Sequence, residues 1–275
     1  MAPPPRFDIR PHIRTNRRSI TFANIATTKA QADTLALIYL TVVKAWETGS
    51  ARIIDSYAQS ISQLVQDAPA DTAAAIDSVD DQIRRLVLML TPELRDWALR
   101  VETVQRRKWI RNILSAVSID LSTVLSLTDV ADTVEASITW NVSLIKDVSD
   151  EIRRKITNSV FSGFQARKSA QDIARDIRAA TGMARQRSIR IAGDQTVKLG
   201  ARLNQARQQQ AGLDHYKWVH SGKAHPRLRH KERNGKVYPW VGKGSIDADD
   251  RPGVPPFCGC TAQGVLVIGD EPTDA

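Results

Sequence analysis

The sequence predicts an α+β protein, with a mostly helical N-terminal part and a small strand-and-loop module at the C-terminus. Hydrophobic residues recur at helical spacing from about residue 27 to residue 210. At Gly212 the pattern changes to short aromatic or β-branched runs bounded by Gly, Pro and Asp. The composition, 42% hydrophobic and 25% charged residues, is typical of a folded protein. The expected domains are a flexible basic arm at 1–26, a helical domain at 27–135, a helical segment at 136–212 and the module at 213–275.

The first residues, MAPPPRFDIRPHIRTNRR, are rich in Pro and Arg and show no hydrophobic period, which predicts an extended or disordered arm. They also lack the apolar core of a secretory signal. The longest apolar runs, LALIYLTVV and LVLML, are far shorter than the roughly 20 residues that span a bilayer. We therefore expect a soluble intracellular protein without a membrane anchor.

The net charge of +9 is spread unevenly along the chain. Residues 31–150 contain 11 Lys and Arg against 17 Asp and Glu, whereas residues 151–214 contain 13 against 5. The arm and the basic segment after residue 150 are therefore candidate contacts for a polyanion such as nucleic acid. Solvated helix faces would carry the same charges, and the sequence is compatible with both roles.

Capping residues and an apolar stripe indicate two of the helices. Thr91 is a candidate N-cap, because Pro92 and Glu93 follow it in the first turn, where both are favoured. The segment SITWNVSLIKDVSDEIRRKITNSVF predicts a second helix. Its expected buried stripe consists of Ile138, Ile145, Val148, Ile152, Ile156 and Val160.

Further helices are expected between residues 169 and 210. Ser169 and Asp172 form a candidate capping pair, and Gly182 is a candidate C-terminal stop. The segment after Gly182 predicts the most regular helix of the chain. Its apolar stripe, expected to pack against neighbouring helices, consists of Ile189, Ala192, Thr196, Leu199, Leu203 and Ala206. A charged row at i,i+4 consists of Arg190, Asp194, Lys198 and Arg202.

The module after Gly212 is too short and too rich in loops to bury a large core of its own. It contains both cysteines of the chain, in the sequence RPGVPPFCGC, and four of the five histidines. Zinc binds thiolate and imidazole ligands, and such a site would stabilise a module of this size. The candidate zinc ligands are Cys258, Cys260, His230 and His225.

The two cysteines also suit roles that involve no metal. They are buried small side chains after a turn, or they carry redox or nucleophilic chemistry, and the sequence leaves these alternatives open. A disulfide between them would close a very small, strained ring. His215 and His220 are expected to be surface or packing residues rather than ligands.

The sequence contains no P-loop, no G-x-G-x-x-G, no H-E-x-x-H and no G-x-S-x-G motif. The carboxylates of Asp247, Asp249 and Asp250 could hold a divalent cation, but Lys243 and Arg251 flank them and favour a solvated loop. We therefore expect a protein that is not an enzyme. Two alternatives stay open: a metal-dependent nuclease that uses His230 and the cysteine loop, and a sequence-independent DNA-binding accessory protein.

Four segments of the C-terminal half follow one another in a characteristic order. They are KSAQDIARDIRAATGMARQRSIRIAGDQ, AGLDHYKW, RLRHKERNGKVY and RPGVPPFCGCTAQGVLVI. Besides the histidine and the cysteines, their motif residues are Trp218, Asn234, Gly235, Tyr238, Pro252, Gly253 and Pro255. This order, over roughly residues 140–268, resembles the phage head-morphogenesis or minor head proteins typified by phage Mu protein F. Members of that family often have Arg between the two cysteines, where this chain has Gly259.

The resemblance implies a structural protein of the virion, bound near the portal inside the capsid and acting in head assembly or in DNA packaging or delivery. It implies the phage portal protein and other head proteins as partners. The basic segments would then contact packaged DNA through its phosphates. During assembly the protein would be in the host cytoplasm.

Overall fold

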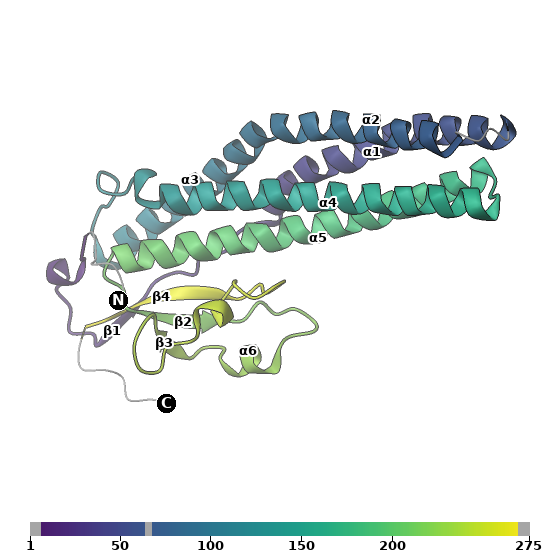
Figure 1. Ribbon diagram of the computed structural model, residues 1–275. Helices are drawn as coiled ribbons and strands as arrows, with labels where there is room; N and C mark the ends of the chain where they lie inside the picture. The colour runs from purple at the N-terminus through teal and green to yellow at the C-terminus, as the bar shows by residue number, and fades with distance from the viewer. Residues whose placement is uncertain (1–6, 64–67, 269–275) are drawn as a thin grey trace. The chain divides into compact units, whose positions relative to one another are not determined.

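The computed structural model describes residues 7–63 and 68–268, and its α+β architecture confirms the expected fold class (Figure 1). The long helices are α1 (Lys29–Gln63), α2 (Ala68–Met89), α3 (Thr91–Val117), α4 (Ala131–Ala166) and α5 (Ala170–Gln210). The short helices are α6 (Leu228–Glu232) and the 3-10 turns η1 (Arg10–His12), η2 (Thr128–Val130) and η3 (Ala248–Asp250). The strands are β1 (Ser19–Thr21), β2 (His215–Val219), β3 (Val237–Pro239) and β4 (Thr261–Val267).

The chain divides into two compact units, and each is made of segments that are distant in sequence. The sheet unit contains residues 1–31, 98–137 and 194–275, and the helical unit contains residues 32–97 and 138–193. The boundaries therefore fall within α1, α3, α4 and α5, whereas the sequence suggested consecutive domains. Long helices conceal such a division, because their hydrophobic period continues without a break from one unit into the next.

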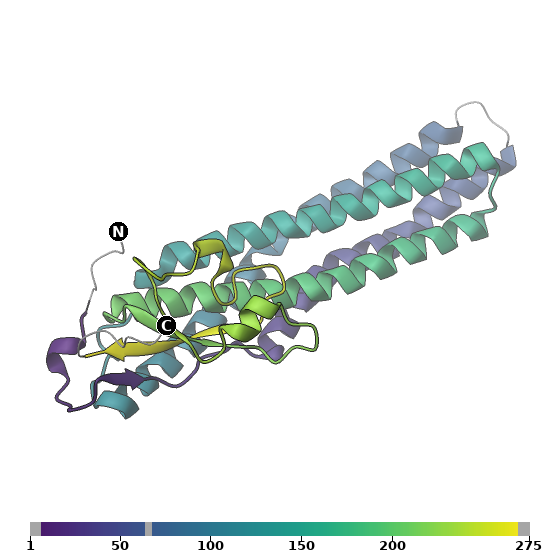
Figure 2. The same ribbon diagram turned by 90° about the horizontal axis from the view of Figure 1, so that it is seen from below.

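In the helical unit, parts of α1, α2, α4 and α5 run side by side (Figure 2). The stripe expected on α4 is confirmed, since all six of its apolar residues are buried. Two buried hydrogen bonds join α1 to α4: Tyr39 Oη donates to Asn141 Oδ1 at 2.8 Å, and Trp46 Nε1 donates to Ser149 Oγ at 2.9 Å. These polar groups of the core are thus paired with one another.

Helix α5 begins as the sequence predicts and ends later than expected. The Asp172 amide N–H donates to Ser169 Oγ at 3.2 Å, which confirms the capping pair. The prediction that Gly182 stops the helix was wrong, because α5 continues to Gln210. The backbone of Gly182 does not adopt a positive φ, and a single helical glycine costs only about 1 kcal/mol, which the long packed helix tolerates. The stop is Gly212, whose φ of +78° favours glycine.

The apolar stripe of α5 is buried only in its middle part. Ala192, Thr196, Leu199 and Leu203 are buried, whereas Ile189 is half exposed and Ala206 is partly exposed. Within the charged row, Asp194 is buried and accepts the backbone N–H of Phe257, in the loop that carries the cysteines. Within this charged row, the buried carboxylate of Asp194 therefore attaches the C-terminal module to α5.

The sheet is antiparallel, in the order β1-β4-β2-β3. Side chains alternate along β2, where Tyr216 and Trp218 are buried and their neighbours are partly exposed. Opposite them lie Tyr238 of β3, which pairs with Tyr216, and Ala262 of β4, which pairs with Trp218. The strands expected after Gly212 are therefore confirmed.

The segment 7–26 is part of the sheet unit, which differs from the flexible arm expected there. It supplies β1, and its side chains Ile9, Ile20 and Phe22 are buried. The Ile9 amide N–H donates to Ala211 O at 3.2 Å, just after α5. A three-residue strand is too short to leave a period in a sequence dominated by Pro and Arg, so this packing was not predictable. Residues 1–6 of the expected arm lie outside the described residues.

Within residues 7–63 and 68–268, no helix has both the length and the apolar character that crossing a membrane requires.

Candidate functional site

Three predicted ligands converge in the sheet unit: His230 from α6, and Cys258 and Cys260 from the loop before β4. The His230 Nδ1 atom lies 3.6 Å from Cys258 Sγ and 3.9 Å from Cys260 Sγ. All three ligand atoms lie within 4.8 Å of one another, and all three residues are buried. Two soft sulfur donors and one imidazole at these distances form a group that can hold a metal ion.

The Pro-Gly-x-Pro-Pro turn places the first cysteine. Gly253 has a φ of +80°, and an added Cβ would lie 2.7 Å from the Cβ of Ala201 on α5, so this position favours glycine. The amide of Gly253 hydrogen bonds to the Cys258 thiolate, and the Cys258 amide N–H donates to Pro255 O at 3.0 Å. The turn therefore holds the cysteine loop against α5 and directs Cys258 inward.

Because Gly259 has no side chain, the space beside it is open to the side chain of Lys223. An added Cβ there would lie 2.9 Å from Ser221 Cβ and 3.0 Å from Lys223 Cε. Lys223 crosses this space, and its Nζ donates to Phe257 O at 2.7 Å. A cation therefore binds the backbone of the cysteine loop at the residue before Cys258, although glycine stands between the two cysteines.

Asp250 contacts the other ring nitrogen of His230, Nε2. The Asp250 Oδ1 atom lies 3.2 Å from His230 Nε2, and the same carboxylate pairs with Arg233 at 2.7 Å and with Arg229 at 2.8 Å. Burial raises the pKa of Asp250, but its hydrogen bonds with Arg233 and His230 outweigh burial, so the pKa is lowered. Trp218 packs edge-on against the imidazole, with ring centroids 5.0 Å apart.

The two thiols are strongly coupled. The pKa of Cys258 is lowered to about 5, chiefly because the Cys260 thiol hydrogen bonds to the Cys258 thiolate. The pKa of Cys260 is raised by the same hydrogen bond and by burial. The two thiols therefore titrate as a coupled pair rather than as independent groups.

The remaining predicted ligand, His225, is not part of the converging group. It lies in the exposed loop between β2 and α6, five residues before His230. His220 is partly exposed, and its amide N–H donates to the motif residue Asn234, at the Oδ1 atom. Of the three neighbouring carboxylates, Asp247 and Asp249 are exposed and only Asp250 contacts His230.

The other motif residues shape the sheet around this group. Gly235 has a φ of +82°, and its amide N–H donates to Trp218 O at 2.8 Å, which closes the connection from α6 to β3. Tyr238 packs beside Tyr216, with ring centroids 6.1 Å apart. Trp218, Tyr216 and Trp240 form one apolar cluster with the cysteines. The motif residues are therefore mainly structural supports of the three-ligand group.

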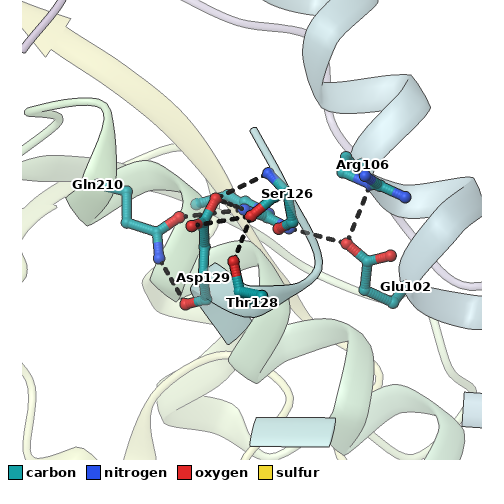
Figure 3. Close-up of polar contacts among 7 residues, drawn as sticks. Glu102, Arg106, Ser126, Thr128, Asp129 and Gln210 are labelled. Carbon is teal, nitrogen blue, oxygen red and sulfur yellow. Dashed lines mark hydrogen bonds and ion pairs between the residues drawn. The ribbon is translucent and has the colours of Figure 1, made fainter. Parts of the chain in front are cut away.

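A second buried polar cluster, which sequence reasoning missed, lies where α3, η2 and the end of α5 meet (Figure 3). Arg207 donates to Glu102 Oε1 at 2.7 Å, to Asp129 Oδ2 at 3.2 Å and to Ser126 O at 2.8 Å. Arg106 also pairs with Glu102, at 3.2 Å, and Gln210 Nε2 donates to Asp129 O at 2.8 Å. We call these residues the ion network.

Residues 150–263 match the model of a family described as phage Mu protein F like protein. The resemblance is confirmed for this segment. The phage Mu protein F-like segment contains all of α5 and the module as far as the middle of β4, and therefore all three converging ligands.

A relative from Haemophilus influenzae, named only as an uncharacterized protein, is 30% identical over 157 residues. The match covers 56% of this chain and 34% of that protein, so the chain spans about a third of the length of the curated relative it matches. No solved structure gives a significant match to the chain.

Proposed function

We propose that this chain is a structural phage minor head protein, without enzymatic turnover, that is bound near the portal inside the capsid and acts in head assembly or in DNA packaging or delivery. The observation that carries the proposal is the family match over residues 150–263. The converging histidine and cysteines and the surrounding motif residues lie within that match, which supports a folded module of this family.

The two units differ in charge in a way that supports DNA contact by the sheet unit. This unit has 23 Lys and Arg against 15 Asp and Glu, whereas the helical unit has 16 against 15. Arg14, Arg17 and Arg18 are exposed in the segment beside β1. Cations in such a surface bind DNA phosphates without sequence preference.

Co-expression with the portal protein encoded by the same phage tests the proposed partner. We expect the two proteins to co-elute in size-exclusion chromatography, and the chain to be present in purified virions. Absence of a complex together with absence from virions would overturn the proposal.

Filter binding with duplex DNA tests the nucleic-acid contact separately. We expect an affinity that falls steeply between about 50 and 200 mM salt. Arg14→Ala/Arg17→Ala/Arg18→Ala should weaken binding, whereas the control Arg85→Ala/Arg154→Ala, at exposed positions of the helical unit, should not. Cutting of the DNA with Mg²⁺, Mn²⁺ or Zn²⁺ that disappears in His230→Ala would instead favour a nuclease.

We also propose that the ion at the three-ligand group is Zn²⁺ and that it stabilises the module. Thiolate and imidazole ligands favour zinc over the hard cations that prefer oxygen. Elemental analysis of the purified protein should give about one zinc per chain, and Cys258→Ser and Cys260→Ser should each lose it. A wild-type protein without zinc, even after reconstitution, contradicts this assignment.

A further inference from the structure

The distances around His230 already fit a tetrahedral zinc site with one bound imidazole. Zn–S bonds of about 2.3 Å and a Zn–N bond of about 2.0–2.1 Å, at tetrahedral angles, separate sulfur from nitrogen by roughly 3.6 Å. The two Sγ–Nδ1 distances are 3.6 and 3.9 Å. The Nε2 atom lies on the opposite side of the ring and faces Asp250 instead.

The partners of Asp250 determine which ring nitrogen carries the proton. Its carboxylate pairs with Arg229 and Arg233, and an ionised carboxylate only accepts hydrogen bonds. The proton of the neutral imidazole therefore lies on Nε2, between the ring and Asp250 Oδ1. The Nδ1 lone pair is then directed toward the two sulfur atoms.

Hydrogen-bond donors surround the two sulfur atoms, and such donors stabilise the negative charge of buried thiolates. The amide of Gly253 hydrogen bonds to Cys258, and the amide of Ser221 hydrogen bonds to Cys260. The indole N–H of Trp218 is buried beside Cys260 and has no oxygen or nitrogen acceptor within the described parts of the chain. Metal-bound thiolates accept such bonds, and these contacts orient the ligands.

We infer that His230 binds the ion through Nδ1, together with Cys258 and Cys260, and that Asp250 is the positioning residue that fixes this tautomer. The inference rests on the proposed zinc site and adds its coordination. Asp250 connects the site to Arg229 in α6 and to Arg233 directly after it, so metal binding and the position of that helix are linked. The described residues supply three ligands, and the fourth position takes another oxygen or nitrogen donor.

The first measurement is the His230 tautomer in the zinc-loaded, full-length protein, by long-range ¹H–¹⁵N correlation NMR. We expect a protonated Nε2 and a metal-shifted Nδ1. The imidazole pattern that is lost in His230→Ala identifies the residue. A spectrum in which zinc perturbs Nε2, with the proton on Nδ1, overturns the inference and leaves the zinc proposal standing.

The second measurement is zinc affinity, by competition with a chromophoric chelator, for Asp250→Asn and two controls. Loss of a partner that orients a ligand typically weakens metal binding 10–100-fold, and we expect a change of about that size for Asp250→Asn. The controls are Asp249→Asn, an exposed carboxylate in the same loop, and His225→Ala, an exposed histidine between β2 and α6, and both should bind as the wild type does.

The outcomes distinguish the zinc proposal from the role of Asp250. A wild-type protein that binds no zinc contradicts the zinc proposal itself. Wild-type binding with an unchanged affinity in Asp250→Asn contradicts only the role of Asp250. A weaker affinity in His225→Ala would show that His225 reaches the metal and would overturn the ligand set. Circular dichroism shows whether Asp250→Asn is folded, and the NMR tautomer of the wild type does not depend on that variant.

Discussion

The sheet unit contains two buried polar clusters whose charges are balanced in different ways. In the ion network, two cations, Arg207 and Arg106, face two anions, Glu102 and Asp129. In the three-ligand group, His230, Cys258 and Cys260 all direct electron-pair donors toward one another. The chain alone balances the charges of the first cluster, whereas the second is the group for which we propose a zinc ion.

The two clusters therefore have different roles. Arg207 joins α5 to α3 and to the segment before α4, because its partners Glu102 and Asp129 come from those elements. Its removal leaves two buried carboxylates without this partner, whatever the solution contains. The three-ligand group should respond instead to metal supply, because the free energy of metal binding adds to the stability of the folded module.

The largest effect is expected from Arg207→Met. Breaking a buried ion pair from one side typically costs about 3–5 kcal/mol, because the remaining charges stay buried without a partner. We expect a decrease of that size in the free energy of unfolding, measured by urea denaturation. The decrease should be independent of zinc.

The matched control for this substitution is Arg202→Met, five residues earlier on α5 at an exposed position. Surface substitutions of this kind usually change stability by less than about 0.5 kcal/mol. Equal effects of the two substitutions would contradict the importance of the ion network.

The next largest effect is expected from metal removal. Zinc that binds only the folded protein, at 100 to 1,000 times its dissociation constant, stabilises by about 3–4 kcal/mol. Chelation should therefore lower the melting temperature of the wild type and leave Cys258→Ser/Cys260→Ser unchanged. A chelator that has no effect on a zinc-loaded wild type would remove the distinction between the two clusters.

The sequence predicted those parts of the fold and site that local patterns determine. The stripe of α4 has helical spacing and one buried face, and Ser169 and Asp172 are three residues apart, so each could be recognised within a few turns. His230 and the two cysteines were recognised because they belong to ordered motifs of a family whose model matches the segment.

The features that could not be predicted depend on contacts between distant segments. Arg207 and Glu102 are 105 residues apart in sequence, and nothing in their neighbours indicates that they are buried together. Asp250 was one of three similar carboxylates in an acidic loop, and only its contacts in the fold, with His230, Arg229 and Arg233, distinguish it. His225 and His230 are equally plausible ligands in sequence, but α6 buries one and leaves the other in an exposed loop.

The smallest effect is expected at the edge of the ion network, from Arg106→Ala. Arg106 pairs with Glu102 one turn away on α3, and its side chain is 28% exposed, so water compensates part of the lost charge. Glu102 keeps Arg207 as its buried partner. We expect a loss of less than about 1 kcal/mol by urea denaturation. If Arg106→Ala cost as much as Arg207→Met, the network would depend on its total charge balance rather than on the buried Arg207. The two clusters would then differ in the number of their charges, not in the burial of Arg207.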